Sequence, residues 1–92
     1  MWSGAAAATR SLALEYATLG IRVNAVCAGI IQAPIDQADS YDGRGDRLPP
    51  LGRAGQINDV VDGVLFLESS PFITGEILHI DGGQVAGYSP FG

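Results

Sequence analysis

GIRVNAVCAGII, residues 20–31, is the stretch that decides the fold, because it joins a short apolar run directly to a glycine loop. Residues 21–27 follow a glycine, are too few for a helix and are rich in β-branched side chains, so they predict a buried strand. In open α/β sheets, ligands bind where parallel strands end. We therefore expect the loop that begins at Gly29 to lie at a ligand-binding edge.

A second unit of this kind, GEILHIDGG, occupies residues 75–83 and predicts a strand over 76–80. Between the two strands, apolar residues recur at helical spacing over 56–68. A helix predicted over 3–19 precedes the first strand and ends at Gly20, since glycine is the usual C-cap residue. The order helix, strand, helix, strand predicts an α/β fold in which a right-handed crossover joins two parallel strands.

The chain is short for such a fold. It has 92 residues and a mass of 9.5 kDa, and a domain of this size buries only about 60–65% of its unfolded surface. Charged residues make up 16% of it, against roughly 25% in soluble domains. Two parallel strands leave faces and edges that need cover. We therefore interpret residues 1–92 as one α/β portion that is incomplete as a domain.

Two segments lack apolar periodicity. Residues 36–50 are rich in aspartate, glycine and proline, which predicts a mobile loop. Residues 84–92 contain further glycine and proline and predict an irregular tail.

Composition excludes several classes of function. The net charge of −5 and five scattered arginines argue against nucleic acid as a partner. One cysteine and one histidine provide no metal-ligand spacing, so we expect no metal. No apolar run reaches membrane-spanning length, and the start lacks the basic region of a signal peptide. A cytoplasmic location without membrane contact is the resulting expectation.

Four polar or reactive residues receive structural interpretations. We expect Asn24 to bond neighbouring backbone, and Asp81, which precedes two glycines, to cap local N–H groups. Cys27 at a strand end is typical of an inert core thiol. His79 lies inside a predicted strand without a sequence partner, so we interpret it as structural.

Five motifs in order connect the chain to a known family: TRSLALEYA at 9–17, GIRVNAVC at 20–27, PLGR at 50–53, VLFL at 64–67 and FITG through DGG at 72–83. Together they resemble the C-terminal part of short-chain dehydrogenases/reductases. The resemblance implies a Rossmann-type, doubly wound parallel sheet and an NAD or NADP cofactor. It also implies a small carbonyl or alcohol substrate, and pairing into a homo-oligomer or with a missing N-terminal half.

The family's catalytic motif is absent from this sequence. In the family, a tyrosine acts as general acid/base and a lysine four residues later lowers its pKa. Here Tyr16, Tyr41 and Tyr88 are each followed four positions later by glycine, and lysine does not occur. No Gly-x-Gly-x-x-Gly opens a strand-to-helix turn either. We therefore assign no catalytic residue and expect the isolated chain to be inactive.

The nicotinamide side of the family's site does have a counterpart. The family's loop reads Pro-Gly-x-Ile-x-Thr, and here residues 28–33 read AGIIQA. The resemblance makes Gly29, Ile31 and Ala33 the candidate cofactor-binding residues. Ala28 in place of proline frees a φ angle, and Ala33 in place of threonine removes a hydroxyl, so we expect weakened contact with the cofactor.

Two functions of different class remain open at this point. The first is the C-terminal portion of an oxidoreductase. The second is a non-catalytic interaction module that pairs with full-length relatives through the helix at 3–19 and the last strand, because exposed apolar edges invite pairing.

Overall fold

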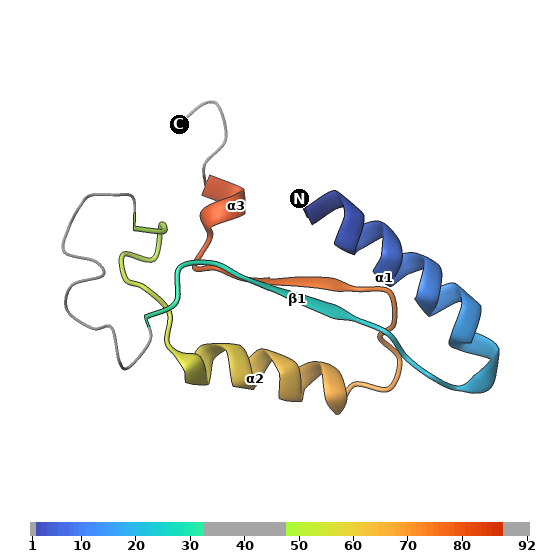
Figure 1. Ribbon diagram of the computed structural model, residues 1–92. Helices are drawn as coiled ribbons and strands as arrows, with labels where there is room; N and C mark the ends of the chain where they lie inside the picture. Colours follow the sequence, from blue (N-terminus) through green and yellow to red (C-terminus); the bar gives the residue numbers. More distant parts are fainter. Residues whose placement is uncertain (1, 33–47, 88–92) are drawn as a thin grey trace.

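The computed structural model describes residues 2–32 and 48–87 (Figure 1). Its elements in chain order are α1 (Trp2–Tyr16), the short 3₁₀ helix η1 (Ala17–Leu19), β1 (Ala25–Ala28), α2 (Ile57–Glu68), β2 (Ile77–Ile80) and α3 (Gln84–Gly87). Ala33 and residues 36–47 of the predicted mobile loop lie outside the described residues.

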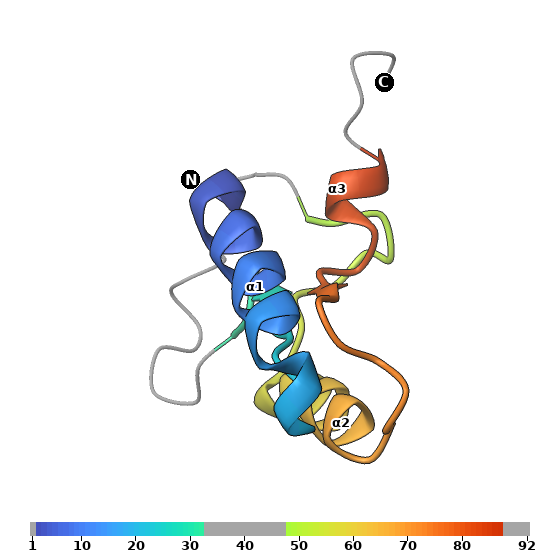
Figure 2. The ribbon, with the colours of Figure 1, turned by 90° about the vertical axis from the view of Figure 1, so that its right-hand side faces the viewer.

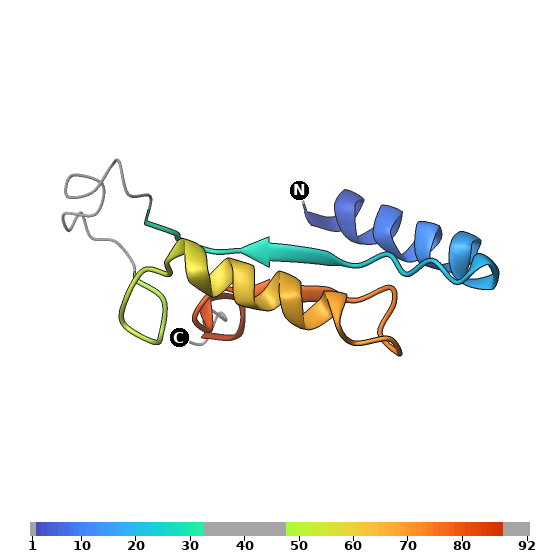
Figure 3. The same cartoon turned by 90° about the horizontal axis from the view of Figure 1, so that it is seen from below.

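The two strands pair in parallel, as the sequence predicts. Ala25 lies opposite Ile77, and Ala28 lies opposite Ile80. Figure 1 shows α1 on one side of the strands and α2 on the other, and Figure 2 shows the two helices from the side. Figure 3, seen from below, shows α2 running along the strands. The arrangement is a helix–sheet–helix sandwich, and α2 forms the crossover between the strands.

The predicted start of the first strand is wrong. β1 begins at Ala25 rather than at residue 21, because the preceding residues bond to partners other than a strand. Val23 donates its N–H to Thr74 Oγ1 at 3.1 Å and accepts the Gly75 N–H at 2.8 Å. The Asn24 amide donates to the Ile73 carbonyl, and its oxygen accepts the Glu76 N–H, which confirms the predicted backbone role. Three side-chain bonds and one backbone bond thus take the place of a regular ladder in this region.

The helix ends also differ in detail from the prediction. The first helix is α-helical only to Tyr16 and tightens to 3₁₀ over the next three residues. Gly20 then caps it in the left-handed region at φ 78°, as predicted. The tail predicted as irregular from residue 84 begins instead with one helical turn, α3. The remainder of the tail, residues 88–92, lies outside the described residues.

Few apolar side chains are buried. Among the described residues, the buried side chains are Thr9, Ala13, Cys27, Pro49 and Leu67. By contrast, Phe72 is 100% exposed and Leu14 is 80% exposed. In a complete α/β sandwich, neighbouring elements cover large apolar side chains of this kind. The fold is therefore an incomplete portion of an α/β sandwich. No helix in the described ranges has both the length and the apolar character needed to cross a bilayer.

The guanidinium of Arg22 holds together segments that few buried side chains connect. Its two terminal nitrogens donate to four backbone carbonyls at the end of α2 and in the following loop: Leu67 at 2.8 Å, Glu68 at 2.8 Å, Ser70 at 3.1 Å and Ile73 at 3.5 Å. The last carbonyls of a helix have no partner within the helix, and a cation beside them is favourable. Arg22 therefore fastens the end of α2 to the segment that precedes β1.

Replacing Arg22 with leucine should lower the free energy of unfolding by about 2 kcal/mol, because charge-assisted bonds to the partly buried carbonyls of Leu67, Ser70 and Ile73 are lost. Urea denaturation followed by circular dichroism measures the change. The matched control is Arg10→Leu, since Arg10 is exposed on α1. Equal stability of the two variants would contradict the role of Arg22.

Gly63 allows close contact between α2 and β2, because a Cβ there would clash with Ile80 Cδ1. Gly63→Val should therefore destabilise the protein by roughly 1–3 kcal/mol through overpacking. Adding Ile80→Val removes the clashing Cδ1 atom and should recover part of the loss. A double-mutant cycle measures this coupling, and strict additivity would show that the two side chains do not meet.

Candidate functional site

The carboxyl ends of both strands meet at one edge of the sheet. Gly29 follows β1 and donates its N–H to the Ile80 carbonyl at 3.0 Å. A Cβ on Gly29 would lie 2.7 Å from the Cβ of Asp81 and 3.0 Å from its Cα. Only glycine fits this approach, so Gly29 is required here by packing against the residue that follows β2.

Asp81 organises the turn after β2. Its Oδ1 accepts the Gly83 N–H at 3.0 Å, and its Oδ2 accepts the Val85 N–H at 3.1 Å. These bonds confirm the predicted capping role. They also explain why α3 forms, because a carboxylate satisfies N–H groups that a helix start otherwise leaves unpaired.

Ile31 forms an isolated parallel bridge with Gly55. Gly55 donates its N–H to the Ile30 carbonyl at 2.8 Å, and its own carbonyl accepts the Gln32 N–H at 2.9 Å. In a parallel pair, a residue can bond the two residues that flank the one opposite it. The N–H and C=O of that opposite residue then point to the other side. The N–H and C=O of Ile31 therefore point away from Gly55, and within the described ranges neither has a hydrogen-bond partner.

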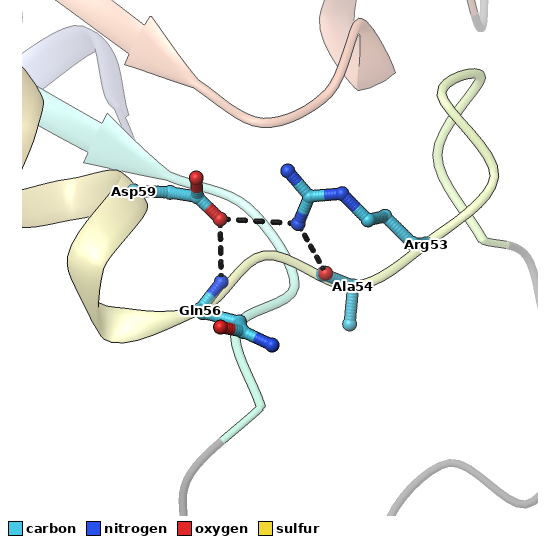
Figure 4. Close-up of polar contacts among 4 residues, drawn as sticks. All are labelled: Arg53, Ala54, Gln56 and Asp59. Atoms are coloured by element: carbon cyan, nitrogen blue, oxygen red, sulfur yellow. Dashed lines mark hydrogen bonds and ion pairs between the residues drawn. The ribbon is translucent and has the colours of Figure 1, made fainter.

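The segment that carries Gly55 is fixed by the start of α2 (Figure 4). Gln56 and Asp59 form a reciprocal capping box, in which Asp59 Oδ2 accepts the Gln56 N–H at 2.8 Å. Arg53 donates to the same oxygen at 3.1 Å. The Arg53 guanidinium first, and then the Gln56 N–H, hold the pKa of Asp59 below its ordinary value.

The segment before Arg53 is tied to the turn after β2. Leu51 donates its N–H to the Gly82 carbonyl at 3.1 Å. A Cβ on Gly82 would lie 3.1 Å from Pro49, and Gly82 has a positive φ of 64° that favours glycine. Residues 49–51 therefore lie directly against the carboxyl edge.

Two adjoining cavities open at this edge. One, of about 380 Å³, is lined by residues that include Ile31, Leu51, Gly55, Asp59 and Asp81. The other, of about 470 Å³, is lined by residues that include Gly29, His79, Asp81 and Gln84. Ile30, His79 and Asp81 line both cavities.

The structure brings two of the three sequence candidates together. Gly29 and Ile31 lie on the same loop at the carboxyl edge, and Ala33 lies outside the described residues. Cys27 is 4% exposed, in keeping with a core thiol. His79 is exposed on β2 and lines both cavities. No cluster of three or more metal-binding side chains occurs in the part of the chain that is described.

The sequence predicts favourable charge or capping by Asn58 or Asp59 near the start of α2, but it does not predict the contribution of Gly55 to the site. A signal for Asp59 was present, because it stands three residues after Gln56, and this is the spacing of a capping box. The pairing of Gly55 with Ile31 had no such signal, since it joins residues across the intervening loop.

Gly29→Ala should displace the loop after β1 and lower the free energy of unfolding by about 1–3 kcal/mol, because the new methyl group meets the Asp81 backbone. Thermal unfolding and the amide spectrum of residues 29–32 measure the two effects. Gly4→Ala is the control, since nothing lies within 4 Å of a Cβ there. A Gly29→Ala spectrum equal to that of the parent chain would contradict the close approach.

The chain matches oxidoreductases over most of its length. A family model described as enoyl-(acyl carrier protein) reductase covers residues 3–84. Glucose 1-dehydrogenase of Gluconobacter oxydans is 44% identical in an alignment 81 residues long that covers 80% of this chain and 30% of the relative. The 3-oxoacyl-(acyl-carrier-protein) reductase FabG of Escherichia coli K12 is 41% identical in an alignment 80 residues long that covers 83% of this chain and 33% of the relative.

The fold matches as well. The structure of ElxO with NADP bound superimposes with a TM-score of 0.76 at 35% identity, over 89% of this chain and 36% of that chain. The chain thus spans about a third of the length of these relatives. The five sequence motifs, the parallel strand pair and these similarities lead to one conclusion: the chain belongs to the short-chain dehydrogenase/reductase family of oxidoreductases.

Proposed function

We propose that residues 28–32 form the nicotinamide-facing edge of the cofactor site in an NAD(P)-dependent oxidoreductase that acts on a carbonyl or alcohol substrate. The observation that carries this proposal is the backbone of Ile31. Its N–H and C=O have no partner within the described ranges and point away from Gly55, at the carboxyl end of a parallel strand.

The polar groups of this loop fit a carboxamide. A carboxamide offers one acceptor oxygen and one NH₂ donor, so it can pair with the N–H and C=O of a single residue. Ile31 would provide that pair, and Gly29 would keep the loop close to the sheet. When bound, the cofactor supplies or accepts a hydride. Ala28 and Ala33 provide neither the fixed φ nor the hydroxyl expected of the family, so this edge alone would bind weakly.

The general acid/base would come from residues beyond these 92, because no tyrosine here has a lysine four positions later. Pairing with an N-terminal half or with another copy would also cover the exposed apolar side chains of α1 and α2. The single buried thiol of Cys27 is compatible with a reducing, cytoplasmic location. The matched relatives carry the names of oxidoreductases, and nothing in these matches favours a non-catalytic interaction module.

Titration with the two halves of the cofactor tests the proposal. Nicotinamide mononucleotide should shift the amide resonances of residues 29–32 at millimolar concentration, because it carries the carboxamide. Adenosine monophosphate, the matched probe without a nicotinamide, should leave them unchanged. Ile31→Pro deletes the N–H and should abolish the response. Shifts of equal size with both probes, or none with nicotinamide mononucleotide, would refute the proposal.

A gain-of-function variant sharpens this test. Ala28→Pro restores the residue that the family resemblance leads us to expect and fixes φ before the loop, so it should tighten binding of nicotinamide mononucleotide. Neither chain should consume NADPH in the presence of an aldehyde or ketone. If the unmodified chain consumes NADPH and Ile31→Pro abolishes that turnover, the general acid/base does not come from residues beyond these 92.

A further inference from the structure

The backbone polar groups of Ile31 are held in place by residues outside the loop. We infer that Asp59 is a positioning residue for the Ile31 backbone and acts on it through Gln56 and Gly55. This inference rests on the proposed function of Ile31. In this inference Asp59 acts through the backbone and not by contact with the cofactor, and its Oδ2 accepts bonds from both Arg53 and Gln56.

The first step joins Asp59 to Gln56. The carboxylate accepts the Gln56 N–H at 2.8 Å, and the Gln56 carbonyl accepts the Asp59 N–H at 2.8 Å in return. Two reciprocal bonds fix the backbone of Gln56 at the start of α2. Because α2 packs on β2 through Gly63, Gln56 has a fixed position relative to the sheet.

The second step joins Gly55 to the loop. Gly55 precedes Gln56 in the chain and makes both backbone bonds that flank Ile31, to Ile30 at 2.8 Å and from Gln32 at 2.9 Å. A Cβ on Gly55 would lie 2.9 Å from Ile31 Cδ1, so the Ile31 side chain lies over this glycine. Any displacement of Gly55 is therefore passed directly to Ile31.

Arg53 completes the unit. One of its nitrogens donates both to Asp59 Oδ2 at 3.1 Å and to the Ala54 carbonyl at 3.0 Å (Figure 4). It therefore ties the residue before Gly55 to the carboxylate that holds the residue after it. The two side chains are 59% and 36% exposed, so their ion pair contributes little stability by itself. Its effect lies in the geometry that it gives to residues 54–56.

Asp62 provides a matched control. It lies one helical turn after Asp59 and lines the same cavity, and no hydrogen bond engages its side chain within the described part of the chain. Removal of the Asp62 carboxylate takes away one negative charge near the site, as removal of the Asp59 carboxylate does. The two positions therefore separate the effect of the capping bonds from the effect of negative charge.

The test compares Asp59→Ala, Asp59→Glu and Asp62→Ala by amide hydrogen exchange. Loss of the cap should speed exchange at Gln32 and Gly55 about five-fold, since a capping bond contributes about 1 kcal/mol. The Gly29 amide, bonded to Ile80, is the internal reference for global unfolding. Asp59→Glu should keep the parent rates, because glutamate suits this position of a capping box. Asp62→Ala should match the parent chain.

The same variants are titrated with nicotinamide mononucleotide. Asp59→Ala should weaken binding several-fold, and Asp59→Glu should restore it. Unchanged exchange at Gln32 relative to Gly29, or unchanged binding together with a lower melting temperature, would show that Asp59 only stabilises α2 and would overturn the inference. Failure of the parent chain to bind the probe refutes the function proposed for Ile31, whereas the exchange rates report on Asp59 independently.

Discussion

The parallel pairing of β1 with β2 is the constraint on which the rest of the structure depends. Because both strands run in the same direction, their carboxyl ends reach one edge together, and the loops that follow them must share that space. Gly29 and Asp81 meet there at a distance that excludes any side chain on Gly29. An antiparallel pair would place one of these loops at the opposite end of the sheet.

The pairing is short, and few side chains are buried around it. Directed polar contacts therefore supplement hydrophobic packing. Arg22 fastens the end of α2, Asn24 joins the approach to β1 with the approach to β2, and Asp81 holds the turn after β2. Each is a side chain bonded to backbone, which ties together segments that a larger core would otherwise hold in place. The candidate site is therefore formed mainly by backbone groups, and side chains of neighbouring segments hold that backbone in place.

Local chemistry made several features predictable. Gly20 ends the first helix, Asn24 bonds backbone and Asp81 caps the following turn, because each property depends on a residue type and its near neighbours. The start of β1 was not predictable. Residues 21–24 have the composition of a strand, but Thr74, Gly75 and Ile73 take up their polar groups from far along the chain. The turn α3 was missed because glycine and proline in the tail outweighed the capping carboxylate that starts it.

The sequence alone determined the α/β class, the order of α1, β1, α2 and β2, and the family, and it identified the loop for which we propose a cofactor contact. These follow from periodicity, from glycine positions and from motifs that are local in the chain. Tertiary structure alone decided how that loop is held. The bridge between Ile31 and Gly55 and the contact between Gly29 and Asp81 join residues more than twenty positions apart. Such contacts arise from the packing of α2 and β2 beside β1, and pattern along the chain carries no information about them.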